Sequence, residues 1–225
     1  MQAVRDLLTP QLLPEPIEPA RARRRRRLVI AATLAAGTAT LGVTLAAPPG
    51  SPAFTLLGFL LATIWGAGSV AAGPLHPHRP TDRIESRRNV GAAVVLGGLA
   101  FATFVGASVL ASHVPALDGA LDSVLATADA GPTALVLAVA VVNAVGEERF
   151  FRGALPIALV GDHRVVVATA VYVLVTVATL NVALVVAAAA MGTVFMLERL
   201  ATGGILAPTL THVTWSTLML VALPG

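Results

Sequence analysis

The chain has 225 residues, of which 56% are hydrophobic and 12% are charged, and its formal net charge is +3. With a mean hydropathy of +0.82, this composition is typical of a multi-span membrane protein and excludes an ordinary soluble domain. The sequence has no cysteine, which excludes disulfides and thiolate nucleophiles. Every basic residue is arginine, and the arginines follow loops and membrane borders rather than one recognition element, so no nucleic-acid partner is expected.

Residues 1–27 are predicted to form a flexible, basic arm on the cytoplasmic side. Four prolines, at positions 10, 14, 16 and 19, disfavour a helix in the first part of this arm. Arg21 and Arg23 to Arg27 follow directly before an apolar run, which is typical of the cytoplasmic border of a membrane span. A patch for anionic lipids and a nucleic-acid arm are the alternative interpretations.

Seven apolar segments follow the arm, three within residues 28–112 and four within residues 132–223. They cover residues 28–47, 54–73, 89–112, 132–160, 165–180, 182–200 and 205–223, and prolines, glycines or polar loops separate them. Segments of about 20 residues match a hydrocarbon core of about 30 Å. The sequence therefore predicts an all-α, polytopic membrane helix bundle with about seven transmembrane segments, and Pro156 is expected to kink or break the fourth.

The arginines also indicate how these segments are oriented. With the N-terminus on the cytoplasmic side, 13 of the 15 arginines lie on that side, none lies outside, and Arg149 and Arg152 lie within a segment. This bias predicts a multi-pass protein of the cell membrane with a cytoplasmic N-terminus. No internal repeat is visible, which disfavours a transporter built on inverted repeats.

The fourth segment carries the charged stretch Glu147-Glu148-Arg149-Phe150-Phe151-Arg152. An ionised side chain at bilayer depth costs about 2.5–3.5 kcal/mol, so such groups usually face the bundle interior and mark a functional site. Glu148 and Arg152 are four residues apart and are expected to form an ion pair on one helix face. Glu147 points about 100° away and stays free, as a general base requires. A purely structural network, in which the arginines neutralise both glutamates, is the alternative.

His212 is the only histidine within a predicted span, and Ser216 follows four residues later on the same helix face. Thr209 belongs to the same polar stripe, so the last segment is expected to turn this stripe towards the bundle interior. The depths of His212 and Glu147 along their segments are compatible with a shared site.

Together these motifs resemble the CPBP family, the CAAX-prenyl-protease and bacteriocin-processing family of intramembrane endopeptidases, which is also called Abi. The stretch from Glu147 to Gly153 is similar to the family's first motif, Glu-Glu-x-Phe-Phe-Arg-Gly. The ending Ala207-Pro208-x-x-x-His212 is similar to its last motif. The resemblance covers about residues 130–223, the part that matches the family's four-helix core.

The resemblance implies a role for each of these side chains. Glu147 would be the base that activates a water against a peptide carbonyl, and Glu148 and Arg152 would orient it and balance its charge. His212 would help to form the oxyanion site or hold the water. The family has been described both as metal-dependent and as glutamate-dependent, so no cofactor is certain and a requirement for a divalent metal stays open.

Two positions depart from the family's pattern. The second motif has an aromatic residue followed four residues later by histidine, whereas the matching place here is Tyr172-x-x-x-Thr176. The last motif usually ends in asparagine, whereas this chain has Ser216. Loss of a histidine that binds water or an oxyanion removes several kcal/mol of transition-state stabilisation. Thr176 or Asn181 can supply a hydrogen bond there but no proton acceptor.

The favoured hypothesis is therefore an intramembrane endopeptidase, a hydrolase that cleaves a membrane protein or peptide within or near the lipid bilayer. The alternative is a catalytically inactive protein of the same fold that acts as a binding or scaffold partner, which the missing histidine favours. A proton- or ion-coupled transporter using the glutamate pair is a third hypothesis. The lack of repeats and of other charges within the spans argues against it.

Overall fold

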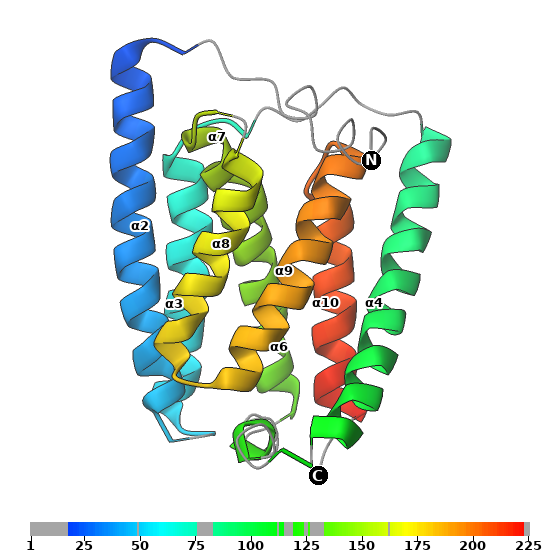
Figure 1. Cartoon of the computed structure of the whole chain (residues 1–225). Helices are drawn as coiled ribbons and strands as arrows, with labels where there is room; N and C mark the ends of the chain where they lie inside the picture. The colour runs from blue at the N-terminus through cyan, green and yellow to red at the C-terminus, as the bar shows by residue number, and fades with distance from the viewer. Residues whose placement is uncertain are drawn as a thin grey trace.

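The computed structural model describes residues 18–48, 50–75, 83–111, 113–114, 119–123, 126, 133–161 and 163–222. Its long helices lie side by side along one axis (Figure 1). They are α2 (Ala20–Ala46), α3 (Pro52–Ala71), α4 (Arg83–Ala111), α6 (Thr133–Glu147), α8 (Arg164–Thr176), α9 (Val182–Thr202) and α10 (Leu206–Ala222). Three short elements complete the part described here: the π-helix η2 (Glu148–Ala154), α7 (Leu155–Ala158) and the 3-10 helix η3 (Val177–Thr179). The predicted all-α membrane bundle is confirmed.

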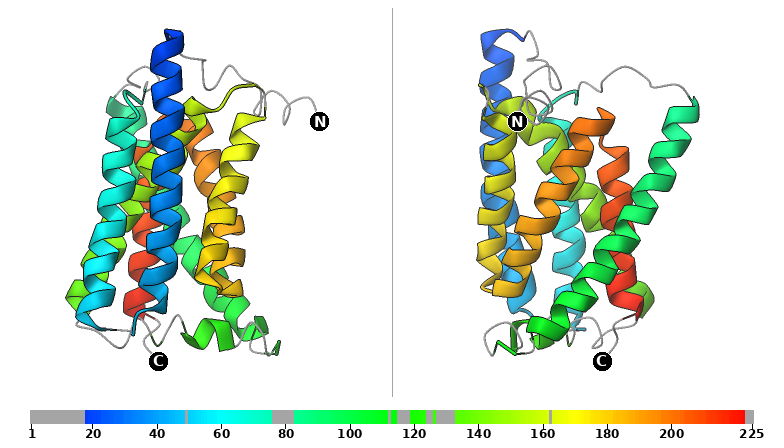
Figure 2. Two further views of the ribbon diagram at one scale, coloured as in Figure 1. Left: turned by 90° about the vertical axis from the view of Figure 1, so that its left-hand side faces the viewer. Right: turned by 45° about the vertical axis from the view of Figure 1, so that its right-hand side comes forward.

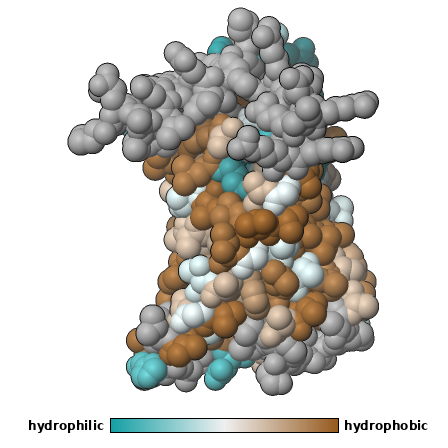
Figure 3. All heavy atoms as spheres, turned by 90° about the vertical axis from the view of Figure 1, so that its right-hand side faces the viewer, coloured by the Kyte–Doolittle hydropathy of each residue, from teal (hydrophilic) through white to brown (hydrophobic). Residues whose placement is uncertain are grey.

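Four helices of the described residues are long and apolar enough to cross a membrane. They cover Ala20–Ala46, Pro52–Ala71, Asn89–Val109 and Val182–Thr202. The face that carries α4 is mostly hydrophobic between its two ends (Figure 3), as a lipid-facing surface requires. The total number of spans stays a prediction, because α6, η2 and α7 divide one column and α8 and α10 are shorter.

The helices surround the glutamate stretch on several sides. Helix α3 packs between α2 and α6, α10 packs against α4, α6 and α9, and α8 packs against α9. Figure 2 shows the same arrangement from two further directions. Small residues permit the closest approach, because a Cβ atom added at Gly37 of α2 would lie 2.2 Å from the ring of Trp65 in α3. This contact brings α2 close enough to form one wall of the site described below.

The prediction that residues 1–27 form a flexible arm is wrong for its last part. Helix α2 begins at Ala20, directly after Pro19, and residues 1–17 of the predicted arm lie outside the described residues. Arginine is a good helix former, so the basic run continues the apolar helix beyond the rest of the bundle (Figure 1). We call this end of the bundle the basic end and the other the opposite end.

Three arginines of this run bind backbone carbonyl groups, two of them at the last residue of a helix and one in the loop after α3. Arg25 donates to Ala71 O (3.3 Å), Arg26 to Pro74 O (3.4 Å) and Arg27 to Ala158 O (3.4 Å). The last carbonyls of a helix lack an intrahelical donor and carry partial negative charge, so guanidinium groups stabilise them. Arg26, which also pairs with Glu18, is only 3% exposed. The basic run is thus part of the fold.

Pro156 does not break the fourth segment, although the sequence predicts a kink or break there. The chain stays helical to Ala158 and widens into the π-helix η2 just before the proline. Proline has no N–H, so the carbonyl of Arg152, four residues earlier, loses its usual donor. The Arg199 side chain of α9 replaces that donor, with Nε 3.1 Å from Arg152 O. The proline therefore leaves the Arg152 carbonyl free for Arg199, and this hydrogen bond connects α9 to the glutamate stretch.

Candidate active site

The two neighbouring glutamates occupy different surroundings. Glu147 is the last residue of α6 and is partly exposed, whereas Glu148 is the first residue of η2 and is completely buried. The π-helical turn begins between them, and such turns are frequent at functional sites. This placement agrees with the expectation that the Glu148 carboxylate is bound within the helix and the Glu147 carboxylate is freer.

Glu148 is held by a buried cation and a histidine. Its Oε1 lies 3.1 Å from Arg152 Nη1 and 2.9 Å from His212 Nδ1. The ion pair expected from the four-residue spacing is therefore present. Arg152 also donates from Nη2 to Gly192 O at 3.2 Å. An ionised carboxylate only accepts hydrogen bonds, so a proton on Nδ1 of His212 would make this contact a hydrogen bond.

Aromatic rings hold both partners of Glu148 in place. The Arg152 guanidinium carbon lies 4.2 Å from the ring centre of Tyr172 and 5.1 Å from that of Phe195. The ring of His212 stacks on Phe195 at 4.6 Å with an interplanar angle of 21°. Rings on either side favour the guanidinium through cation–π attraction. The position of His212 is therefore set by Glu148 through Nδ1 and by Phe195 through its face.

The carboxylate of Glu147 has a different partner. The Tyr172 hydroxyl of α8 donates to Glu147 Oε2 over 3.1 Å. The sequence identified Tyr172 only as the aromatic residue of a motif that lacks its histidine. Its hydroxyl group was the available signal, because a phenol inside a membrane bundle needs a hydrogen-bond partner.

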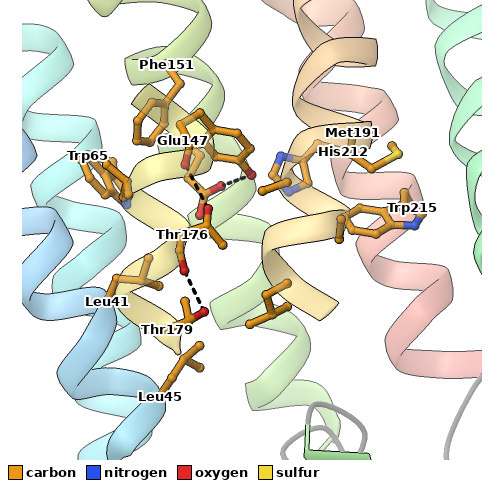
Figure 4. Close-up of a pocket in the computed structure, with 15 residues that line it drawn as sticks. Leu41, Leu45, Trp65, Glu147, Phe151, Thr176, Thr179, Met191, His212 and Trp215 are labelled. Carbon is orange, nitrogen blue, oxygen red and sulfur yellow. Dashed lines mark hydrogen bonds between the residues drawn. The ribbon is translucent and has the colours of Figure 1, made fainter. Parts of the chain in front are cut away.

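Glu147 and His212 line the same cavity, which has a volume of about 180 Å³. Tyr172 and Thr176 are further polar residues at its wall, and Figure 4 shows Glu147, Thr176 and His212 around one space. Since a water occupies about 30 Å³ of liquid, the cavity has room for several. The remaining wall residues are Leu41, Leu45, Trp65, Phe151, Val175, Thr179, Leu184, Ala187, Ala188, Met191 and Trp215.

Some of the other predicted site residues line this cavity and some do not. Glu148 and Arg152 stand behind it and do not line it, and Ser216 is not among its lining residues either. Thr176 lines it, but its hydroxyl donates to Tyr172 O in the same helix at 3.0 Å. Asn181 is used elsewhere, since it caps α9 by accepting from Leu184 N at 3.0 Å. Asn181 is therefore not a substitute for the missing histidine.

Glu198 is a third acidic residue inside the bundle, and its position in the sequence predicted no role for it. Its Oε1 accepts from the Thr211 hydroxyl at 2.8 Å, and the same hydroxyl lies 3.0 Å from Ala93 O. Glu198 does not line the cavity. Among the described residues, no group of three or more histidine, aspartate or glutamate side chains is placed to hold a metal ion.

Comparison with known proteins gives one family match. Residues 129–218 match the family model described as Type II CAAX prenyl endopeptidase Rce1-like. This part of the chain is similar to the CPBP family. The match contains the glutamate stretch on η2, the Tyr172-x-x-x-Thr176 segment of α8 and His212 of α10. The CPBP resemblance is thereby confirmed over this Rce1-like region. No curated protein and no solved structure matched the chain.

Proposed function

We propose that this protein is an intramembrane endopeptidase in which Glu147 activates a water against a peptide bond. The observation that carries the proposal is the shared cavity, where the freer carboxylate of Glu147 meets a histidine fixed from behind by a buried ion pair. The match of residues 129–218 to an endopeptidase family supports the same reaction class. The Glu147, Glu148, Arg152 and His212 side chains are the residues we assign to it.

In the proposed reaction, a water in the cavity gives a proton to Glu147 while its oxygen forms a bond to the peptide carbonyl carbon. The carbonyl π electrons move to the oxygen, which becomes the oxyanion of a tetrahedral intermediate. When the intermediate collapses, the C–N bond breaks and Glu147 returns the proton to the leaving nitrogen. The products are a new carboxyl terminus and a new amine, and Glu147 regains its starting state.

His212 is proposed to act through its second ring nitrogen. Because Nδ1 contacts Glu148 Oε1, the remaining Nε2 is the ring nitrogen available at the cavity wall. In the neutral ring with its proton on Nδ1, Nε2 accepts a hydrogen bond from the water; in the doubly protonated ring, Nε2 donates to the oxyanion. Arg152 balances the charge of Glu148, so Glu148 can orient His212 without bringing an uncompensated anion beside the oxyanion. Two ionised carboxylates in one apolar region repel each other, and the ion pair of Glu148 with Arg152 lowers the cost of keeping both ionised.

The test is hydrolysis in a membrane. Purified protein in liposomes is incubated with bilayer-inserted peptides in water labelled with heavy oxygen, and the products are sequenced by mass spectrometry. The proposal expects new peptide termini and one heavy oxygen atom in each new carboxyl group. Absence of cleavage over a broad set of apolar peptides would favour the inactive binding protein instead.

The alternative function rests on two observations. Thr176 stands where the family's second motif has histidine, and the Tyr172 hydroxyl occupies Glu147 Oε2. Both features fit a protein that keeps the fold and binds a membrane partner without cleaving it. The experiment below separates this alternative from a slow protease.

Replacing Thr176 by histidine is expected to raise the rate of cleavage. Thr176 lines the cavity with Glu147, so an imidazole there adds a proton acceptor or donor beside the reacting water. We expect roughly a tenfold to hundredfold increase in kcat, since a positioned acid–base group contributes about 10²–10⁴-fold at best. The rate is measured on the labelled peptides. Thr193→His is the control, because Thr193 is exposed on α9 and makes the same hydrogen bond to its own helix.

Replacing Tyr172 by phenylalanine is expected to lower kcat by about 10²-fold with little change in KM. The hydroxyl donates to Glu147 and fixes the position of its carboxylate, and a misplaced catalytic group can cost about 10²-fold in rate. Phenylalanine keeps the ring beside Arg152, so the protein should unfold at nearly the same temperature. The split between kcat and KM is measured on one peptide. An unchanged or increased kcat would mean that the hydroxyl only blocks Glu147.

We further propose that the protein spans the cell membrane about seven times, with its N-terminus in the cytoplasm. Its substrates are proposed to be membrane proteins or peptides. The uneven distribution of arginine supports this orientation. The position of Arg21 to Arg27 at one end of α2, outside the apolar part of the bundle, agrees with it (Figure 2).

A further inference from the structure

The cavity extends from Glu147 in one direction only. Leu41 and Leu45 line it from the last turns of α2, which starts at the basic end. Thr179 lines it from η3, and Leu184 from the first turn of α9. Figure 4 shows Glu147 and His212 above, Thr176 between, and Thr179 and Leu45 below. The cavity therefore runs from the proposed catalytic groups towards the opposite end of the bundle.

Towards the basic end, tightly packed aromatic rings close the cavity. Trp65, Phe150 and Phe151 have ring centres 4.9–5.1 Å apart in each pair. Trp65 and Phe151 are 1% exposed, Phe150 is 0% exposed, and Leu155 behind them is 2% exposed. At the other end Leu45 is 36% exposed. The exposure of the wall thus rises with distance from the basic end, as expected for a cavity with its mouth at the opposite end.

The wall between the mouth and Glu147 offers little to a polar ligand. Its hydroxyl groups donate within their own helix: Thr176 to Tyr172 O at 3.0 Å and Thr179 to Thr176 O at 2.7 Å. The other wall residues are aliphatic or aromatic apart from Tyr172, Glu147 and His212, and Trp215 adds one indole N–H that has no hydrogen-bond partner among the described residues. No cation of the basic run lines this path. The path therefore suits an apolar segment and has no group that would attract a charged one.

Glu147 lies deep in the bundle as seen from the opposite end. It is the last residue of α6, about 21 Å along the helix from Thr133 at about 1.5 Å per residue. Thr133 begins α6 at the opposite end (Figure 1). A substrate segment that reaches Glu147 from this end must therefore extend about six residues into the bundle, at about 3.3 Å each.

The geometry points to a binding path for an apolar, extended segment of a membrane polypeptide. The segment enters from the membrane half opposite the arginine run and reaches Glu147 through this path. This inference rests on the proposed function for its substrate, and it adds the side and the chemistry of the approach. Closure by the aromatic rings excludes approach from the basic end, and the apolar wall selects segments without charge.

Single-cysteine variants test the side of approach, because the chain has no cysteine of its own. The probe is a thiol-reactive apolar peptide with a charged, membrane-impermeant tail, applied to sealed vesicles of either orientation. Arg24→Cys and Ala46→Cys, at the two ends of α2, report the two membrane faces. Thr176→Cys lies within the path, and Thr193→Cys is the matched lipid-facing control, because both threonines donate only to their own helix.

We expect Thr176→Cys to react only from the face that labels Ala46→Cys, at least tenfold faster than Thr193→Cys from either face. Reaction from the face that labels Arg24→Cys, from both faces, or from neither would overturn the inference. The labelling needs no cleavage, and we expect the same pattern in a Glu147→Gln background. A failed approach path is thereby distinguished from a failed proposed function.

Cleavage provides a second readout in an active preparation. The Thr179→Cys variant is assayed before and after modification with a bulky thiol reagent, and Arg24→Cys is treated in parallel. We expect modification at Thr179→Cys to lower its own cleavage rate at least tenfold, and modification at Arg24→Cys to change its rate less than twofold. The reverse result would contradict a path at the opposite end. If neither variant responds, the path is not used by the substrate.

Discussion

Replacing Glu147 by glutamine is expected to lower kcat for peptide cleavage by about 10²–10⁴-fold, the contribution of a general base. Glutamine has nearly the same size and can still accept the hydrogen bond from Tyr172 through its amide oxygen. It cannot take a proton from water at any pH of interest, so the loss should not be recovered by raising the pH. The measurement is the initial rate of cleavage in liposomes, together with Tm to show that the protein is folded.

Glu198→Gln is the matched control for this experiment. Glu198 is also a partly buried glutamate inside the bundle, and its carboxylate also accepts from one hydroxyl group. It does not line the cavity, so we expect a rate within about twofold of the unmodified protein. Cleavage that survives in Glu147→Gln would remove Glu147 as the base. Equal loss in both variants would indicate a general effect of charge within the bundle.

Replacing Arg152 by methionine is expected to destabilise the protein by about 3–5 kcal/mol, because it leaves the completely buried Glu148 without its cation. For a chain of this size each kcal/mol shifts Tm by about 2–4 °C, so Tm should fall by about 6–20 °C. The variant also loses the hydrogen bond to Gly192 O and the contacts with the rings of Tyr172 and Phe195. Thermal unfolding in detergent measures the change.

The double variant Glu148→Met/Arg152→Met shows whether charge or shape causes the loss. When both charges are removed, no uncompensated ion remains, so the double variant should be more stable than the single Arg152→Met variant. Its cleavage rate should stay low, because His212 loses the carboxylate at Nδ1. The surface control is Arg21→Met, for which we expect a change within about 0.5 kcal/mol. Additive losses from the two single changes would argue against a coupled buried pair.

Much of the fold follows from local features of the sequence. The helix bounds agree with the apolar runs to within a few residues at most ends, because prolines, glycines and polar loops end helices through local backbone chemistry. Glu148 and Arg152 meet as expected because a four-residue spacing places both side chains on one face of a helical segment. Even the π-helical turn leaves this pair within reach.

Side-chain contacts between different helices could not be predicted from local features of the sequence. That His212 binds Glu148 and Tyr172 binds Glu147 depends on how far each helix is rotated about its axis and shifted along it. The π-helix before Pro156 adds to the difficulty, because a wider turn changes the face that every following residue presents. The carbonyl groups bound by Arg25, Arg26 and Arg27 likewise belong to other segments of the chain, 46 or more residues away.

By itself, the sequence determined that this is an all-α membrane bundle with a charged, CPBP-like motif in one apolar segment, since composition, periodicity and short spacings are properties of the chain alone. Only the tertiary structure decided which glutamate is bound by Arg152 and His212, which one lines the cavity, and towards which end that cavity runs. The physical reason is that a cavity is the space left between several packed helices, and no single segment contains it.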